Sequence, residues 1–236
     1  GTKYDTLEKV ISVLRKCIRV VLSGLQGSNY PIAFSEKNDV IKSYMKMLHG
    51  EGGFDSSKKI VPGDFVGPSS VTLQIPNIME MKEDSNYPNI RKNYTVTDKA
   101  DGERKLLYIN ETGKLYLIDT NMNVTFTGTM TKKKFAYNTL LDGEHIKYNK
   151  RKEFINLYAA FDVYYINGKS VREFAFYPSN DEKDLSKYRL PLLKNVVEQI
   201  EYIPIMKENE KEKQGERNAC DFVLRSKVFY AEDRKS

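Results

Sequence analysis

The feature that most constrains this chain is a change of hydrophobic period at Tyr94. From there to about residue 165, apolar and polar residues alternate with a period of two, in short runs separated by turn residues. This period is typical of β-strands, and short turns between strands favour antiparallel neighbours. The expected strands span 94–98, 104–110, 115–119, 124–127, 140–141, 144–148, 154–156 and 157–165. The sequence therefore predicts an antiparallel meander.

Helices are predicted on both sides of this region. Before it, apolar residues recur at helical spacing over about 4–25 and 38–48, with Asn38 as a candidate cap. A loop-rich stretch, 50–68, and a short expected strand at 71–75 follow. After the sheet region we expect a helix over 190–202 and a strand at 221–224. The fold class is thus α+β, with an N-terminal helical segment at 1–55 and a sheet domain at 56–236.

Composition excludes several classes of protein. No apolar run approaches the roughly 20 residues that cross a bilayer, so no membrane partner is expected. Cys17 and Cys220 are too few for a disulfide framework or a four-cysteine zinc site. With only two histidines, His49 and His145, catalysis centred on histidine is not favoured. Any chemistry must come from Lys, Asp, Glu and Arg.

The charge of the chain favours a polyanionic partner. The net charge is +6, which suits nucleic acid or a nucleoside triphosphate. Two basic clusters, 132–134 and 147–152, fit phosphate contacts, although a solvated loop explains either cluster alone.

The candidate nucleophile is Lys99, in Lys99-Ala100-Asp101-Gly102-Glu103-Arg104 between two expected strands. A lysine attacks phosphorus only when neutral, and lowering its pKa from near 10.4 to about 7 needs roughly 4 kcal/mol. Partial burial, the nearby Arg104 or a bound metal would act in that direction. Asp101 would oppose the shift, so it suits an orienting role. A hairpin turn with solvated charges explains the same residues.

Three further apolar runs each contain or end in an acidic residue. They are 115–119, which ends in Asp119; 140–144, which ends in Asp-Gly-Glu; and 159–163, which carries Asp162. Carboxylates at the ends of buried strands, near a candidate nucleophile, suit a divalent cation and a ribose. Each run alone has an ordinary explanation in turn chemistry, but their joint occurrence in this order is far more specific.

This set of motifs resembles the covalent nucleotidyltransferase superfamily, which comprises mRNA capping guanylyltransferases and polynucleotide ligases. The segment 99–104 matches the lysine motif of that superfamily in full, and the three carboxylate runs resemble its next motifs. The segment 65–73 loosely resembles the Pro-Val-Ser segment of capping enzymes. The motif spacing is similar to that in capping enzymes of large DNA viruses of the mimivirus-like group. The resemblance covers roughly residues 60–230.

The resemblance implies a guanylyltransferase reaction. Lys99 would attack the α-phosphate of GTP, expel pyrophosphate and carry a lysyl-GMP, and the GMP would pass to a 5′-diphosphate RNA end. The implied nucleotide-binding residues are Asp101, Gly102, Arg104, Asp119, Phe126 and Glu144. Phe126 would stack on the base, although core packing is the more ordinary explanation of this residue. Glu144 and Asp162 would bind Mg²⁺ or Mn²⁺ as cofactor.

The chain also departs from the superfamily pattern. It shows no match to the late acidic-glycine strand, to the paired phosphate-binding lysines or to the C-terminal OB-fold, so we expect a nucleotidyltransferase domain that is incomplete at its C-terminus. The resemblance implies a place in a larger multidomain capping enzyme, in the host cytoplasm or virion if the chain is viral. Two alternatives stay open: a ligase-type adenylyltransferase that uses ATP, and a non-catalytic RNA-binding fragment.

Overall fold

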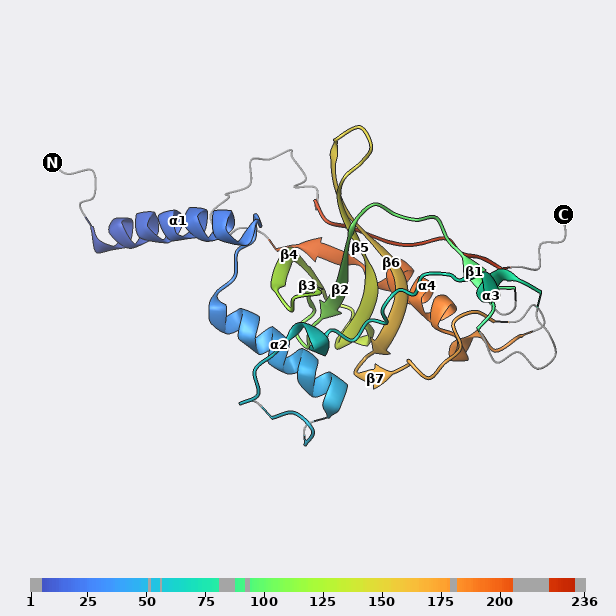
Figure 1. Ribbon diagram of the computed structural model, residues 1–236. Coiled ribbons are helices and arrows are strands. Elements are labelled where there is room, and N and C mark those ends of the chain that lie inside the picture. Colours follow the sequence, from blue (N-terminus) through green and yellow to red (C-terminus); the bar gives the residue numbers. More distant parts are fainter. Residues whose placement is uncertain are drawn as a thin grey trace.

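A computed structural model of the chain describes residues 6–50, 52–55, 57–80, 88–91, 94–178, 182–205 and 221–231. Its centre is a curled antiparallel sheet, and one helix extends away from the body (Figure 1). The helices are α1 (Leu7–Gln26), α2 (Phe34–His49), α3 (Ile75–Ile78) and α4 (Arg189–Gln199), with 3-10 turns at Pro62–Asp64, Lys134–Ala136 and Leu185–Lys187.

The strands form one large sheet and one small ribbon. They are β1 (Thr95–Val96), β2 (Glu103–Ile109), β3 (Lys114–Asp119), β4 (Val124–Thr131), β5 (Thr139–Tyr148), β6 (Phe154–Ile166), β7 (Lys169–Ser170), β8 (Tyr202–Pro204), β9 (Val223–Ser226) and β10 (Tyr230–Ala231). The large sheet has the order β7-β6-β5-β2-β3-β4-β8, with β9 parallel to β6, and β1 pairs with β10. The predicted α+β class, with an N-terminal helical segment and an antiparallel sheet, is confirmed.

Both faces of the sheet carry a core. Leu107 and Ile109 of β2 pack with Leu193 of α4 in one buried cluster. Leu106 and Tyr108, which alternate with them, belong to a second cluster that includes residues of α2. Because β2 is covered on both faces, its sequence is a continuous apolar run and does not alternate between apolar and polar residues.

Three strands are longer than predicted, and the first of them, β4, extends to Thr131 instead of residue 127. The expected runs 140–141 and 144–148 are one strand, β5, and the runs 154–156 and 157–165 are one strand, β6. The prediction of a turn at Asp142-Gly143 is therefore wrong. Gly143 pairs with Lys105, and a Cβ at Gly143 would collide with the ring of Tyr158, so the glycine serves close packing inside the sheet.

The segments before the sheet also differ from expectation. Helix α2 begins at Phe34, four residues before the proposed cap Asn38. Residues 71–75 form no strand, because nothing in the described part of the chain pairs with them. Helix α1 has the predicted amphipathic pattern and ends at Gly27, whose φ is 58°, but none of its residues is buried. It contributes no residue to either buried core cluster.

No helix in the described part of the chain combines the length and the apolar character that a membrane crossing requires. Helix α2 contributes to the core of the sheet domain. The domain boundary at 55/56 stays a prediction.

Candidate active site

The segment that joins β1 to β2 carries Lys99. Two residues earlier, the hydroxyl of Thr97 donates a hydrogen bond to the backbone oxygen of Val228, at 2.7 Å, which ties this segment to the chain before β10. Lys99 is exposed. The expected partial burial of this lysine is therefore absent.

Gly102 of the lysine motif is required by packing. A Cβ at this position would lie 2.9 Å from Cγ1 of Ile146 and 3.0 Å from the backbone oxygen of His145, closer than side chains tolerate. The glycine therefore brings the motif directly against β5. Its neighbour Asp101 is exposed, and no hydrogen bond among the described residues gives it an orienting role.

Arg104, near the start of β2, is held by a buried carboxylate. Its Nε and Nη2 donate to the two oxygens of Asp142, at 3.2 and 2.5 Å, and the Asp142 side chain has no exposed surface. The hydroxyl of Tyr164 donates to the same carboxylate at 2.6 Å. The hydrogen bonds that Arg104 donates to Asp142 raise the pKa of the Arg104 guanidinium, and burial raises the pKa of the Tyr164 hydroxyl. The guanidinium is thus charged and fixed in orientation.

The segment 65–68 covers this arginine. Nη1 of Arg104 donates to the backbone oxygen of Pro68 at 2.6 Å, and the guanidinium carbon lies 5.5 Å from the centre of the Phe65 ring. Arg104 occupies the space that a Cβ on Gly67 would need. The part of the chain with the loose Pro-Val-Ser resemblance is therefore packed onto the lysine motif.

A pocket of about 380 Å³ contains Glu144. This residue lies directly opposite Arg104 in the β2–β5 pairing. Its Oε2 is buried and has no hydrogen-bond partner among the described residues. Because a buried carboxylate oxygen without a donor is unfavourable, the pocket suits a ligand that brings a hydroxyl group or a cation. The lining residues are Thr97, Glu144, Phe161, Asp162, Phe176, Arg189, Lys227 and Phe229.

Asp162 also lines this pocket, but its oxygens are occupied. Nε and Nη2 of Arg189 donate to its two oxygens at 2.8 and 3.2 Å, and the backbone N–H of Val163 donates at 2.8 Å. Burial raises the pKa of Asp162, and the hydrogen bond from Arg189 opposes this rise. The described residues contain no group of three metal-ligating side chains. Of the two predicted metal ligands, Glu144 therefore fits a cation and Asp162 does not in this arrangement.

Sequence reasoning missed three residues of this site: Asp142, Arg189 and Lys227. Asp142 was visible in the Asp-Gly-Glu motif but was assigned to a turn. Arg189 and Lys227 come from α4 and from the residue after β9. Their positions depend on the packing of α4 on β6 and on the parallel pairing of β9 with β6, which no local pattern in the sequence reveals.

Of the predicted nucleotide contacts, only Glu144 lines this pocket; Arg104 lies opposite it in the β2–β5 pairing, and the others, Asp101, Gly102, Asp119 and Phe126, are also not among the lining residues. Asp119 ends β3, and its Oδ1 accepts hydrogen bonds from the backbone N–H groups of Asn121 and Asn123, so it stabilises a turn. Phe126 is 8% exposed and packs against Tyr116, with ring centres 5.2 Å apart. Contact of either side chain with a nucleotide stays a prediction.

The chain is similar to known proteins along most of its length. The family described as mRNA capping enzyme, catalytic domain, matches residues 29–229. A protein of Acanthamoeba polyphaga mimivirus, described as a probable mRNA-capping enzyme, is 26% identical over 171 residues. That match covers 72% of this chain but only 13% of the mimivirus protein, so the chain spans a small part of this relative's length.

Proposed function

Because this chain belongs to the family of mRNA capping enzyme catalytic domains, we propose that Lys99 carries the nucleotide in its reaction. The neutral Nζ of Lys99 attacks the α-phosphorus of GTP, an N–P bond forms, the bond to the pyrophosphate oxygen breaks, and the nitrogen releases one proton to solvent. A terminal oxygen of a 5′-diphosphate RNA end then attacks the same phosphorus. The N–P bond breaks, and the lysine recovers its electron pair and a proton.

The observation that carries this proposal is the unpartnered oxygen of Glu144. A ribose offers hydroxyl groups, which would donate to Oε2 and remove the cost of leaving it unpaired. Thr97 and Glu144 line one pocket, so a nucleotide held there lies next to the segment that carries Lys99. This geometry fits a nucleotide more closely than it fits a sheet that only binds RNA.

Arg104 supports the same site through its fixed position. Since Asp142 and Pro68 hold its guanidinium, a ligand meets a preorganised cation and no side-chain entropy has to be lost on binding. We assign Asp142 as the residue that positions Arg104 and Arg104 as the residue that contacts the nucleotide.

Glu144 is the residue that would hold Mg²⁺ or Mn²⁺, together with oxygens of the triphosphate. Mg²⁺ commonly binds through one or two carboxylates plus phosphate oxygens, so a single free carboxylate suffices. When bound, the ion would offset the negative charge of the triphosphate. Lys227 and Arg189 line the same pocket, so the protein itself also supplies positive charge there.

Nucleotide labelling tests this function. The full chain, incubated with Mg²⁺ and GTP labelled at the α-phosphate, should retain label through denaturation. Lys99→Arg, which keeps the charge but removes the nucleophile, should abolish it. Retention of label by Lys99→Arg would overturn the assignment of Lys99. Equal labelling by ATP would favour a ligase-type adenylyltransferase, and absence of labelling by either nucleotide would leave only a binding module.

The mimivirus relative is much longer than this chain. We therefore also propose that the domain works within a larger capping enzyme, as expected for a viral protein that acts in the host cytoplasm. GTP and the RNA 5′ end are its proposed substrates.

A further inference from the structure

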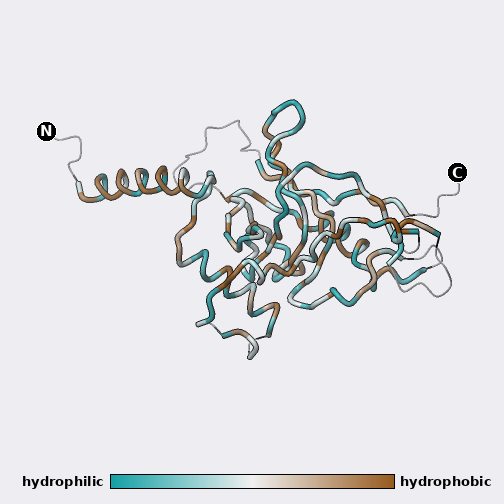
Figure 2. The backbone as a smooth tube through the Cα atoms, viewed as in Figure 1, coloured by the Kyte–Doolittle hydropathy of each residue, from teal (hydrophilic) through white to brown (hydrophobic). Residues whose placement is uncertain are grey.

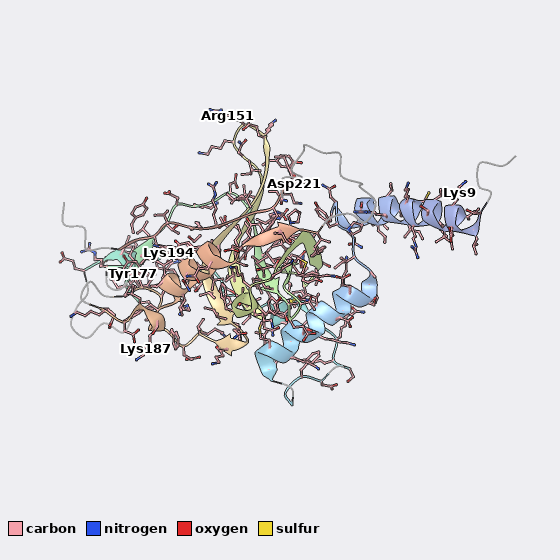
Figure 3. All side chains as sticks on the ribbon, turned by 180° about the vertical axis from the view of Figure 1, so that it is seen from behind. Lys9, Arg151, Tyr177, Lys187, Lys194 and Asp221 are labelled. Atoms are coloured by element: carbon pink, nitrogen blue, oxygen red, sulfur yellow. The ribbon has the colours of Figure 1, made fainter. Side chains whose placement is uncertain are left out.

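The connection between β5 and β6 forms a projecting hairpin, which we call the basic hairpin and define as residues 147–154. It rises above the sheet, and its tip is strongly hydrophilic (Figures 1 and 2). The side chain of Arg151 lies at the tip and points away from the body (Figure 3). The cations of the hairpin are Lys147, Lys150, Arg151 and Lys152, and all four are exposed.

The tip is built so that its positive charge stays available. Asn149 accepts hydrogen bonds from the backbone N–H groups of Arg151 and Glu153, at 2.9 and 3.0 Å, and its amide group donates to the Glu153 carboxylate at 2.6 Å. The one acidic side chain of the hairpin is thus bound to an amide. No ion pair within the described residues involves any of the four cations.

An exposed aromatic pair stands at the base of the tip. Tyr148 and Phe154 are 58% and 53% exposed and lie opposite each other in the β5–β6 pairing. Their ring centres are 5.7 Å apart with an interplanar angle of 65°. Exposed aromatic faces next to clustered cations are the combination that binds single-stranded nucleic acid, because bases stack on the rings while the cations neutralise phosphates.

A groove of about 330 Å³ adjoins this pair, and its lining includes the polar residues His145 and Asn156. Nδ1 of His145 lies 3.3 Å from Nζ of Lys105, which lies behind the lining, and Nε2 of His145 lies 2.7 Å from Oδ1 of Asn156. An ammonium group only donates, so Nδ1 accepts, and Nε2 carries the proton and donates to Asn156. The groove therefore offers apolar side chains together with polar groups of fixed hydrogen-bond polarity. This combination suits a nucleobase better than a purely apolar ligand.

The hairpin lies at the end of the sheet where the lysine motif enters. Glu103, the first residue of β2, pairs with His145, and Gly102 packs on Ile146. Ile146 is two residues from Tyr148 along β5. An RNA strand that binds the hairpin can therefore reach the Lys99 segment by following this edge of the sheet.

We propose that the basic hairpin, with Tyr148 and Phe154, binds the nucleotides next to the 5′ end of the single-stranded RNA that accepts the GMP. This inference rests on the proposed function only for the identity of the RNA as acceptor. Single-stranded RNA is favoured over a duplex because stacking on exposed rings requires unpaired bases.

The test is RNA binding by fluorescence anisotropy, using a 5′-diphosphate single-stranded RNA labelled at its 3′ end. Tyr148→Ala/Phe154→Ala should weaken binding at least fivefold with an unchanged salt slope, since stacking is lost while the charges remain. Lys150→Ser/Arg151→Ser should lower the slope of log K against log salt by about 1.4, at about 0.7 for each phosphate contact.

The matched control is Lys42→Gln/Lys46→Gln, which removes the same charge from the exposed face of α2. It should change the affinity and the salt slope much less than the hairpin variants do. An equal effect of the control, an unaffected Tyr148→Ala/Phe154→Ala variant, or tighter binding of an equally charged duplex would overturn the proposal.

GTP labelling of the same variants separates this proposal from the proposed function. Both hairpin variants should still form the labelled adduct and should lose only its transfer to RNA. If the wild-type chain is not labelled, the proposed function fails while the anisotropy result still decides the RNA surface. If it is labelled but binds no single-stranded RNA, the hairpin proposal fails alone.

Discussion

At the scale of single residues, the site is organised by pairs in which one member positions the other. Asp142 holds Arg104, and Arg189 holds Asp162, so each pair has a cation and a carboxylate with little freedom to move. The sequence identified one member of each pair, because lysine-motif and carboxylate patterns are local. The partners depend on cross-strand register and helix packing, which a single sequence does not reveal.

The first prediction concerns the pair of Arg104 and Asp142. Asp142→Asn should cost about 2–3 kcal/mol of unfolding free energy, less than a fully buried pair, because Arg104 is partly exposed. It should also reduce GTP labelling by loosening the guanidinium. Urea unfolding and labelling measure the two effects.

A double-mutant cycle with Arg104→Gln provides the control for that prediction. The double variant should lose less stability than the sum of the two single variants, since neither charge is then left alone. Additive losses would show that the two side chains do not act as a pair.

The second prediction concerns His145. Burial lowers its pKa, and the charges of Lys105 and Lys147 act in the same direction, while the hydrogen bond with Asn156 opposes them. In the unfolded chain His145 therefore takes up a proton near pH 6.5, whereas in the folded chain it does so only at lower pH. The free energy of unfolding consequently falls as the pH drops below about 6.5. The limiting slope is about 1.4 kcal/mol per pH unit.

Urea midpoints at pH 7.5 and 5.5 measure this effect. His145→Asn should lose less stability between the two values than the wild type does. His49→Asn, at the exposed end of α2, should behave like the wild type. An identical pH response in His145→Asn and wild type would contradict the assignment.

At the scale of elements, α1 shows that an amphipathic pattern does not by itself predict burial. Its apolar residues have the same spacing as those of a packed helix, but none is buried, whereas α2 and α4 bury theirs against the two faces of the sheet. The pattern correctly predicted that a helix forms. What the helix contacts is a tertiary property that periodicity does not contain.

The third prediction compares equal truncations in two helices. Leu193→Ala in α4 should cost about 2–5 kcal/mol, because Leu193 has no exposed surface and its loss leaves a cavity. Leu14→Ala in α1 should change stability by less than about 0.5 kcal/mol, because Leu14 is 57% exposed. Urea unfolding measures both, and similar losses would indicate that α1 is packed in solution.

At the scale of the whole molecule, the class of fold was predictable and the continuity of the long strands was not. Alternation and short turns indicated an antiparallel sheet, but Asp142-Gly143 looked like a turn because the same dipeptide serves tight turns elsewhere. Here the glycine admits the ring of Tyr158, and β5 continues through it. The pocket around Glu144 depends on that continuity, since a turn would have sent Glu144 in another direction.

The bond from Thr97 to Val228 joins residues that are 131 positions apart in the chain. On a ribosome, the segment that carries Lys99 therefore emerges long before Val228, which anchors it, and non-local contacts of this kind form late in folding. Until then, the growing polypeptide holds Lys99 without the side of the pocket that Lys227 and Phe229 supply.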